Sequence, residues 1–450
     1  MKTYVLTESV LLQSPGAIFV FDDNEVVIPE VVIQQLAKFK NIKTDEGANA
    51  RQLARELDEL RQCGCLTQGV PLKNGGILKV EMNHHSVKLP PNWNPKDPDI
   101  RALQVCLALK QEHKQVALVT RDVFQRIQAT SVGIEAQEFL NERIEQHYTG
   151  RTTVACIPSL IDTFYKQGFL NLSQLSREMA VNLELIKNQF VILKAPEGLS
   201  GSALTRFDGE KFVSLKYAND TPYGIKPQTV GQRFAIEALM TPPEEAPLCI
   251  IKGVAGSGKT LLALAAGLSY VMTHTPNPRY RRILVCRPNV TMDEELGYLP
   301  GTEQEKISPL LRPIKDNLEI LVDSDENERY KNENKLADKV EELFNRRLIA
   351  AEAINFLRGR SLVKHFLIID EAQNLTPGRI KGIITRAGKG TKVVLLGDPS
   401  QVDHPYLDQR SNGLVYAAEN MKGSPLCYQV SLEEHECERS PLALEGALRL

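Results

Sequence analysis

One short glycine-rich segment that ends in Lys-Thr restricts the folds open to this chain more than any other feature. It runs from Gly253 to Thr260, after the apolar run 248–251 and before the helix-forming residues 261–271. Glycines at such a turn let backbone N–H groups point inward around phosphates, and the dipole of the next helix favours the same negative charge. Strand, loop and helix in this order predict a P-loop nucleotide site rather than a glycine-rich structural turn.

Two side chains of this loop add chemistry to its backbone. Lys259 is expected to reach the β- and γ-phosphates, and the Thr260 hydroxyl is expected to bind Mg²⁺. We predict that ATP is bound by the whole loop, which consists of Gly253, Val254, Ala255, Gly256, Ser257, Gly258, Lys259 and Thr260.

An acidic pair follows a second apolar run. Asp370 and Glu371 come directly after the run 366–369. Asp370 is expected to hold Mg²⁺ through water, and Glu371 to polarise the attacking water as a general base. An Asp-Glu pair alone is commonly a solvated strand end, but its place after a buried run and downstream of a P-loop favours catalysis.

Three more residues are candidates around the phosphates. Gln401 follows Gly-Asp-Pro after another apolar run and is expected to sense the γ-phosphate or orient water, with a plain turn as the alternative. Arg386 and Arg439 are candidates for stabilising the transition state, either within one chain or in a neighbouring subunit's site.

Apolar runs alternate with helical patterns at both ends of the chain, which is typical of α/β folds with parallel sheets. We expect a small α/β domain over 1–149, a β-rich connector over 150–222 and a nucleotide-binding domain over 223–450. Residues 323–347 carry many charges of both signs and are expected to form a solvated helix. In the last domain we expect buried strands at 248–251, 283–286, 366–369 and 393–396.

Bulk composition limits the partners and the compartment. The net charge of −2 gives no general attraction to nucleic acid, so such binding would need local patches. No apolar run approaches the ~20 residues that cross a bilayer, and the N-terminus does not read as a secretory signal, so we expect no membrane association. Cys63 and Cys65 lack a second pair at zinc spacing, and reduced thiols in a cytoplasmic protein are expected.

Residues 223–440 resemble the PhoH family, a branch of P-loop ATPases close to superfamily 1 helicases. The resemblance implies a RecA-like ATPase core, single-stranded RNA as partner and a ring of six subunits. It also implies that Gln232 recognises adenine and that Arg287 contacts a nucleic-acid backbone; no basic stripe or stacking motif here demands RNA. It rests on stretches that follow the family's order: Tyr223-Gly224-Ile225-Lys226-Pro227, Cys286-Arg287-Pro288, Gly297-Tyr298-Leu299-Pro300-Gly301, Arg358-Gly359-Arg360-Ser361, Asp370-Glu371-Ala372-Gln373-Asn374, Ile384-Thr385-Arg386-Ala387-Gly388, Gly397-Asp398-Pro399-Ser400-Gln401 and Glu438-Arg439-Ser440.

The N-terminal domain resembles a PIN domain, a nuclease fold known in front of PhoH domains. PIN nucleases hold Mg²⁺ or Mn²⁺ with about four acidic groups. The chain retains Asp99 and Asp122, but it has non-acidic residues where the family normally has acidic ones: Thr7, Gln35 and Thr130.

Two neighbouring glutamates are not expected to replace the missing acidic residues. Glu8 faces the other side of the sheet if the first strand continues through it. Glu30 lies about 140° around a helix from Gln35. Asp99 and Asp122 alone would form a weak metal site, so we expect little or no nuclease activity and a role in RNA binding or assembly.

We therefore expect an ATP-hydrolysing, RNA-dependent helicase or translocase behind a degenerate PIN domain. Two alternatives stay open. One is an ATP-dependent ribonuclease whose PIN site works with Asp99, Asp122 and a third ligand. The other is an ATP-gated RNA-binding or assembly switch.

Overall fold

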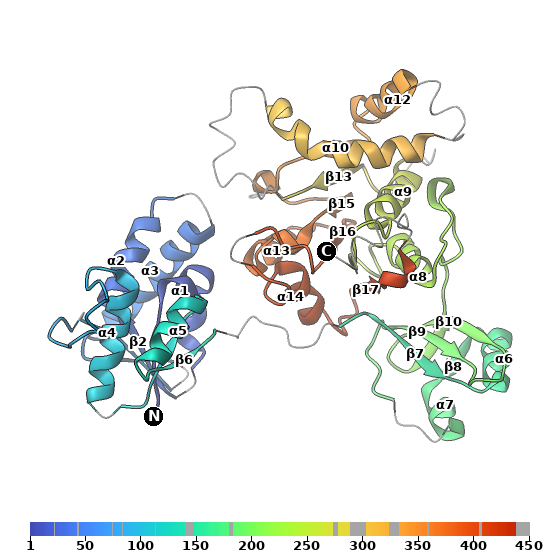
Figure 1. The fold of residues 1–450 in the computed structure, drawn as a ribbon. Helices are drawn as coiled ribbons and strands as arrows, with labels where there is room; N and C mark the ends of the chain where they lie inside the picture. The colour runs from blue at the N-terminus through green and yellow to red at the C-terminus, as the bar shows by residue number, and fades with distance from the viewer. Residues whose placement is uncertain are drawn as a thin grey trace. The chain divides into compact units, whose positions relative to one another are not determined.

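The computed structural model divides the chain into two compact units, Met1–Arg143 and Ile144–Leu450, which are described separately. Both are built on sheets with parallel strands, so the predicted α/β class is confirmed (Figure 1). The described residues are 1–21, 23–42, 45–73, 75–82, 84–112, 114–139, 148–179, 183–272, 278–288, 303–323, 333–357, 360–404 and 407–437.

The first unit has a six-stranded sheet in the order β3-β4-β2-β1-β5-β6, parallel except for β3. Its strands are β1 Thr3–Leu6, β2 Glu25–Pro29, β3 Val70–Pro71, β4 Ile77–Glu81, β5 Val116–Val119 and β6 Glu135–Gln137. Its helices are α1 Glu8–Gln13, η1 Pro15–Phe19, α2 Glu30–Phe39, α3 Asp45–Cys63, α4 Pro98–Gln111 and α5 Val123–Ser131. Strand β5, next to the edge strand β6, is apolar and buried at every position because both faces of the sheet are covered.

The second unit begins with a small five-stranded sheet in the order β7-β9-β10-β11-β8. Its elements are β7 Arg151–Ala155, α6 Pro158–Gln167, β8 Phe169–Asn171, α7 Leu172–Met179, β9 Phe190–Lys194, β10 Ser202–Phe207 and β11 Lys211–Ser214. Phe190 of β9 is fully buried and stacks on Phe234 of the following domain, with ring centroids 4.7 Å apart. The small sheet therefore shares a core with the nucleotide-binding domain, and the predicted borders of the segment 150–222 stay predictions.

The large sheet of this unit is parallel throughout, in the order β14-β13-β15-β16-β12-β17. The four expected strands are β12, β13, β15 and β16; β14 and β17 extend the edges. The strands are β12 Leu248–Gly253, β13 Arg282–Cys286, β14 Ile349–Ala351, β15 His365–Ile369, β16 Lys392–Gly397 and β17 Cys427–Leu432. The helices are η2 Pro222–Gly224, α8 Val230–Met240, α9 Lys259–Val271, α10 Glu303–Val322, α12 Glu333–Asn345, η3 Ile354–Leu357, η4 Ala372–Asn374, α13 Pro377–Ile384, α14 Gly413–Asn420 and η5 Glu434–Glu436.

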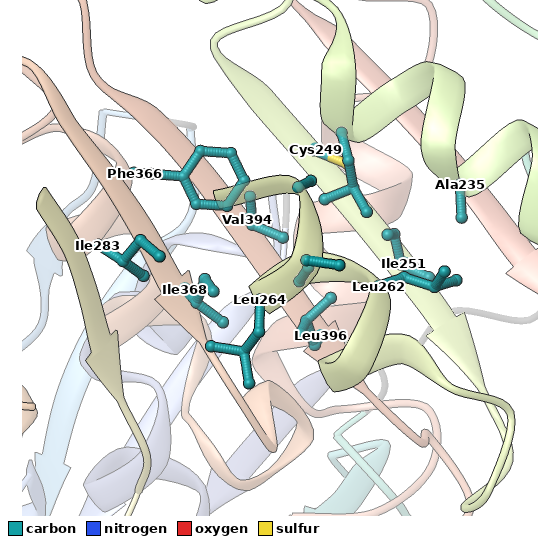
Figure 2. Packing of buried hydrophobic residues seen from close by; sticks show 14 of the residues in the cluster. Ala235, Cys249, Ile251, Leu262, Leu264, Ile283, Phe366, Ile368, Val394 and Leu396 are labelled. Atoms are coloured by element: carbon teal, nitrogen blue, oxygen red, sulfur yellow. The ribbon is translucent and has the colours of Figure 1, made fainter. Parts of the chain in front are cut away.

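Helix α9 fixes this sheet from one face. Apolar side chains of α9 lie against strand residues, as Figure 2 shows for Leu262, Leu264, Ile251, Ile368 and Leu396. A Cβ on Gly267 of α9 would lie 2.9 Å from an Ile283 methyl group, so the helix approaches β13 as closely as glycine allows. This packing sets the ends of β12, β15 and β16 at one edge, where parallel sheets bind ligands.

Two expectations about sequence patterns can be compared with the described elements. Helix α12 lies inside the charged stretch 323–347, while residues 324–332 lie outside the described part of the chain. Among the described residues, none of the helices combines the length and hydropathy required to cross a bilayer.

Candidate nucleotide site

The glycine-rich loop turns between β12 and α9 through two left-handed residues. Gly256 and Gly258 have φ values of 79° and 82°, which L side chains rarely adopt. Lys259 follows at the start of α9 and is only 9% exposed. Its Nζ donates to the carbonyl oxygens of Gly253 at 2.6 Å and Val254 at 2.8 Å. The ammonium group thus lies within the loop that the sequence assigns to the phosphates.

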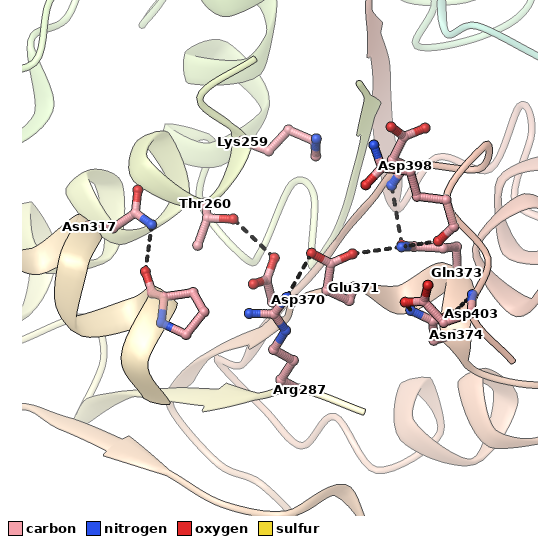
Figure 3. A network of polar contacts seen from close by, with 12 residues as sticks. Lys259, Thr260, Arg287, Asn317, Asp370, Glu371, Gln373, Asn374, Asp398 and Asp403 are labelled. Carbon is pink, nitrogen blue, oxygen red and sulfur yellow. Dashed lines mark hydrogen bonds and ion pairs between the residues drawn. The ribbon is translucent and has the colours of Figure 1, made fainter. Parts of the chain in front are cut away.

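The Thr260 hydroxyl and the carboxylate of Asp370 meet across the sheet. The hydroxyl donates to Asp370 Oδ1 at 3.0 Å, although the two residues are 110 positions apart (Figure 3). Asp370 directly follows β15 and is 5% exposed. A hydroxyl and a carboxylate are the hard oxygen ligands that Mg²⁺ prefers, so these two side chains fit the ion that accompanies ATP.

Opposite charges gather around these groups. Burial lowers the pKa of Lys259, against the opposing effect of Asp398, Glu371 and Asp370. Burial, then the charge of Glu371, raises the pKa of Asp370, while Arg287 is the strongest opposing influence. The cation and the carboxylates are therefore parts of one electrostatic unit.

Glu371 is held in an unusual backbone conformation. Its φ is 55°, in the left-handed region that costs a non-glycine residue on the order of 1 kcal/mol or more. Its Oε1 lies 3.1 Å from Nη2 of Arg287, which follows β13, and its Oε2 accepts a hydrogen bond from Gln373 Nε2 at 2.6 Å. Both carboxylate oxygens are thus oriented by neighbouring side chains (Figure 3).

Gln373 links the end of β15 to the end of β16. It is fully buried, and its Nε2 also donates to the carbonyl of Gln401 at 2.9 Å. Its Oε1 accepts from the backbone N–H of Asp398 at 3.2 Å. A Cβ on Gly397 would lie 2.2 Å from that Oε1, so only glycine fits there. The side-chain amide of Gln373 therefore joins the loop after β15, which holds the acidic pair, to the Gly-Asp-Pro loop after β16.

Asp398 is a buried carboxylate beside this junction. It is 5% exposed, and its Oδ1 accepts from the backbone N–H and the hydroxyl of Ser400. Its Oδ2 is buried without a hydrogen-bond partner among the described residues. An uncompensated buried acceptor is costly, so a further donor or a cation at this oxygen would be stabilising.

Gln401 and Gln232 reach the site in different ways. The backbone of Gln401 lies at the Gln373 junction, whereas its side chain is exposed. Gln232 is 8% exposed in the first turn of α8, and its Oε1 accepts from the N–H of Gln228 at 2.8 Å. Its Nε2 lies 3.6 Å from the position of a Cβ on Gly258. Their roles towards phosphate and adenine stay predictions.

Of the two candidate arginines, only Arg386 is among the described residues, and it is not brought to the P-loop. Arg386 donates to the carbonyls of Gly382 at 2.9 Å and Leu357 at 2.5 Å. Its own carbonyl accepts from Leu362, in the segment that leads into the amino end of β15. That edge is opposite the P-loop, so Arg386 does not reach the P-loop of its own chain. Arg439 lies outside the described residues.

In the first unit, Asp99 lies in the first turn of α4 and Asp122 is the N-cap of α5. Asp122 caps α5 by accepting from the N–H of Phe124 at 2.7 Å, and Asp99 Oδ1 accepts from Gln125 Nε2 at 3.3 Å. The Oε1 of Gln125 accepts from the Thr120 hydroxyl at 2.6 Å. The Gln125 side-chain amide thus ties Asp99 to Thr120, which follows β5, while Asp122 accepts from the backbone N–H of Gln125.

The assumption that the first strand runs through Glu8 is wrong. Strand β1 ends at Leu6 and α1 begins at Glu8, so strand alternation no longer decides where this side chain points. Burial raises the pKa of Glu8, and the charges of Asp99 and Asp122 raise it further. Glu8 therefore belongs to the same acidic group as the two retained aspartates.

Metal ligands are not preassembled in the described part of the chain. There, no three His, Cys, Asp or Glu side chains are placed to share an ion. Cys63 and Cys65 are exposed free thiols, as expected for an unpaired Cys-x-Cys.

Comparison with known proteins decides the family. A PhoH-like protein model matches residues 224–447, and a PIN domain model matches residues 4–140. Protein PhoH2 of Bacillus subtilis strain 168 is 39% identical over 454 residues, covering 98% of both chains. The chain belongs to the PhoH family. Protein PhoH2 of Thermobispora bispora is 34% identical, covering 98% of this chain and 95% of that protein.

The match to PhoH2 proteins covers both halves, so the predicted PIN–PhoH arrangement is confirmed. A PhoH-like protein of Bacillus subtilis matches only 48% of this chain, at 34% identity. PhoH domains are P-loop ATPases, so the C-terminal part of this PhoH protein is an ATP-binding P-loop domain.

Two further site residues, Gln373 and Asp398, appear in the sequence only as members of longer motifs. Their burial and their contacts in the structure identify them as parts of the nucleotide site.

Proposed function

We propose that this PhoH protein is an RNA-dependent ATPase of the helicase or translocase type that works as a ring of six subunits. ATP binds at residues 253–260, and Gln232 recognises adenine. Thr260 and Asp370 hold Mg²⁺, which neutralises charge on the phosphates. Glu371 orients the attacking water and accepts its proton.

An arginine completes the site. Arg386 of a neighbouring subunit, or Arg439 of the same or a neighbouring subunit, stabilises the transition state; Arg386 is held by the carbonyls of Gly382 and Leu357 and does not reach the P-loop of its own chain. The PIN domain contributes RNA binding and has weak or no nuclease activity.

The ion pair between Arg287 and Glu371 supports the link to RNA most directly. Arg287 is the residue proposed to contact the nucleic-acid backbone, and Glu371 is the proposed general base. Nη2 of Arg287 lies 3.1 Å from Oε1 of Glu371. A phosphate group that binds Arg287 competes with the Glu371 carboxylate for the same guanidinium. RNA would then free Glu371 for water, and hydrolysis would accelerate only when RNA is bound.

Steady-state ATP hydrolysis with and without single-stranded RNA tests this proposal. RNA should raise kcat of the wild type, and Arg287→Gln should remove the response to RNA. Lys259→Ala serves as the blank and should hydrolyse ATP in neither condition. Turnover that ignores RNA would contradict the motor and favour an ATP-gated assembly switch, in which ATP changes oligomer size.

One observation favours a second candidate, an ATP-dependent ribonuclease. The charges of Asp99 and Asp122 raise the pKa of Glu8, so these three side chains are the candidate ligands for Mg²⁺ or Mn²⁺, although they would have to move closer to share one ion. Cleavage of single-stranded RNA with Mn²⁺, lost in both Asp122→Ala and Glu8→Gln, would support this function. Intact RNA with either metal would exclude it.

A further inference from the structure

A buried ion pair joins the small sheet to the ligand edge of the large sheet. Arg151 is the first residue of β7, and its Nη1 lies 2.6 Å from Oε2 of Glu436. The side chains are 8% and 6% exposed, and Nη2 of Arg151 lies 2.8 Å from Glu433 Oε1. Desolvation offsets most of the attraction in such a pair. The main effect of this ion pair is therefore to hold two segments in a fixed arrangement, although Arg151 and Glu436 are 285 positions apart in the sequence.

Glu436 also holds the first turn of α8. Its Oε1 accepts from the backbone N–H of Gly231 at 2.7 Å, one of the donors that a helix start leaves free. A Cβ on Gly231 would lie 2.4 Å from Glu436 Oε2 and 2.9 Å from Arg151 Nη1, so the helix touches the pair itself. Burial favours the neutral acid, but the N–H groups of Glu433 and Gly231, together with Arg151, lower the pKa of Glu436.

The same segment reaches the P-loop. Cys437 follows Glu436, and its Sγ lies 3.3 Å from the carbonyl oxygen of Ala255. Gln232 follows Gly231 and has its amide beside Gly258. The residues after β17 thus contact both the start of α8 and the phosphate-binding loop.

We propose that Arg151 and Glu436 are positioning residues of the ATP site. The pair sets the first turn of α8, and with it Gln232, against the P-loop. The small sheet is then a structural part of the nucleotide site rather than a linker. This inference rests on the proposed recognition of adenine by Gln232 and is independent of RNA.

Hydrolysis kinetics of the full chain without RNA test the pair. Arg151→Gln and Glu436→Gln should raise KM for ATP about tenfold, equivalent to about 1.4 kcal/mol, while kcat stays close to wild type. The preference for ATP over GTP should fall in parallel, because GTP makes no use of an adenine-recognising amide. Arg151→Lys keeps the charge and should restore most of the affinity.

A second connector arginine provides the control. Arg206 of β10 donates to Asn188 Oδ1 at 2.7 Å and lies 4.7 Å from the ring of Tyr428, at the opposite end of β17. Arg206→Gln should lower the melting temperature and leave KM for ATP unchanged.

An unchanged KM in folded Arg151→Gln and Glu436→Gln would overturn the proposal, as would an equal rise in Arg206→Gln. If Arg151→Gln does not fold, Glu436→Gln and the control Arg206→Gln decide the question by the same comparison. A wild type that ignores RNA would contradict only the proposed motor function.

Discussion

The two acidic sites of this chain are built in opposite ways. In the ATPase domain, Asp370 faces a hydroxyl and Glu371 is held between a guanidinium and an amide. In the PIN domain, Glu8, Asp99 and Asp122 act on one another as like charges, and the contacts of the two aspartates are an amide and backbone N–H groups. In the first site, Glu371 has a cationic partner in Arg287. In the second, the contacts described for the two aspartates come from neutral donors, and neighbouring like charges raise the pKa of Glu8.

The largest expected effect tests the first half of this comparison. Glu371→Gln keeps the contacts that a neutral amide can make but removes the proton acceptor, so kcat should fall by about 10²–10⁴-fold. ATP binding should persist, because the P-loop is untouched. Asp122→Asn should leave ATP turnover unchanged. Measured kcat and ATP affinity check both variants, and a small loss in Glu371→Gln would mean that another group activates water.

The next prediction concerns the amide that joins two corners of the ATPase site. Gln373→Ala removes the hydrogen bonds to Glu371, Gln401 and Asp398, so the base loses its orientation and kcat should fall about tenfold, or about 1.4 kcal/mol. Gln429 is a matched control, because it is buried in β17 and donates to the Ala418 carbonyl at 2.9 Å.

Gln429→Ala should destabilise the fold and spare kcat. Thermal melting and steady-state kinetics of both variants separate the two effects. Equal losses of kcat in Gln373→Ala and Gln429→Ala would show that Gln373 acts through stability alone.

The ATPase site could be predicted further than the PIN site for a physical reason. Strands buried on both faces appear as continuous apolar runs, so the ends of β12, β15 and β16 could be located from the sequence. Their order in a parallel sheet then brings Thr260 and Asp370 together. The position of Glu8 depended on whether the first strand continues through it. The strand ends at Leu6, two residues before Glu8, and local patterns place such boundaries poorly.

Contacts between segments that are far apart in the sequence could not be predicted from the sequence. Gln373 is identifiable as a link only once β16 lies beside β15. Arg151 and Glu436 meet only because the small sheet packs on the ATPase core, where Phe190 is buried against Phe234. The sequence separation between Gln373 and β16, and that between Arg151 and Glu436, do not predict a contact.

The smallest expected effect tests the like charges around Glu8 in the PIN domain. A carboxyl whose pKa is raised by folding binds more protons in the folded chain than in the unfolded chain. The first unit therefore loses stability as pH rises from the ordinary pKa of Glu8 to its raised value, and the loss is complete above it. Glu8→Gln removes this loss, so its melting temperature should exceed that of the wild type at pH 7 and approach it at low pH.

Calorimetry between acidic and neutral pH, repeated with Mn²⁺, sharpens the comparison. If Glu8, Asp99 and Asp122 await a cation, Mn²⁺ should raise the melting temperature of the first unit in the wild type and do so less in Glu8→Gln, since binding to the folded form stabilises it. An equal rise in both would place the ion elsewhere. If Mn²⁺ raised the melting temperature of neither protein, the acidic group would be a remnant of a metal site. The ATPase site and the PIN site would then differ in function as well as in structure.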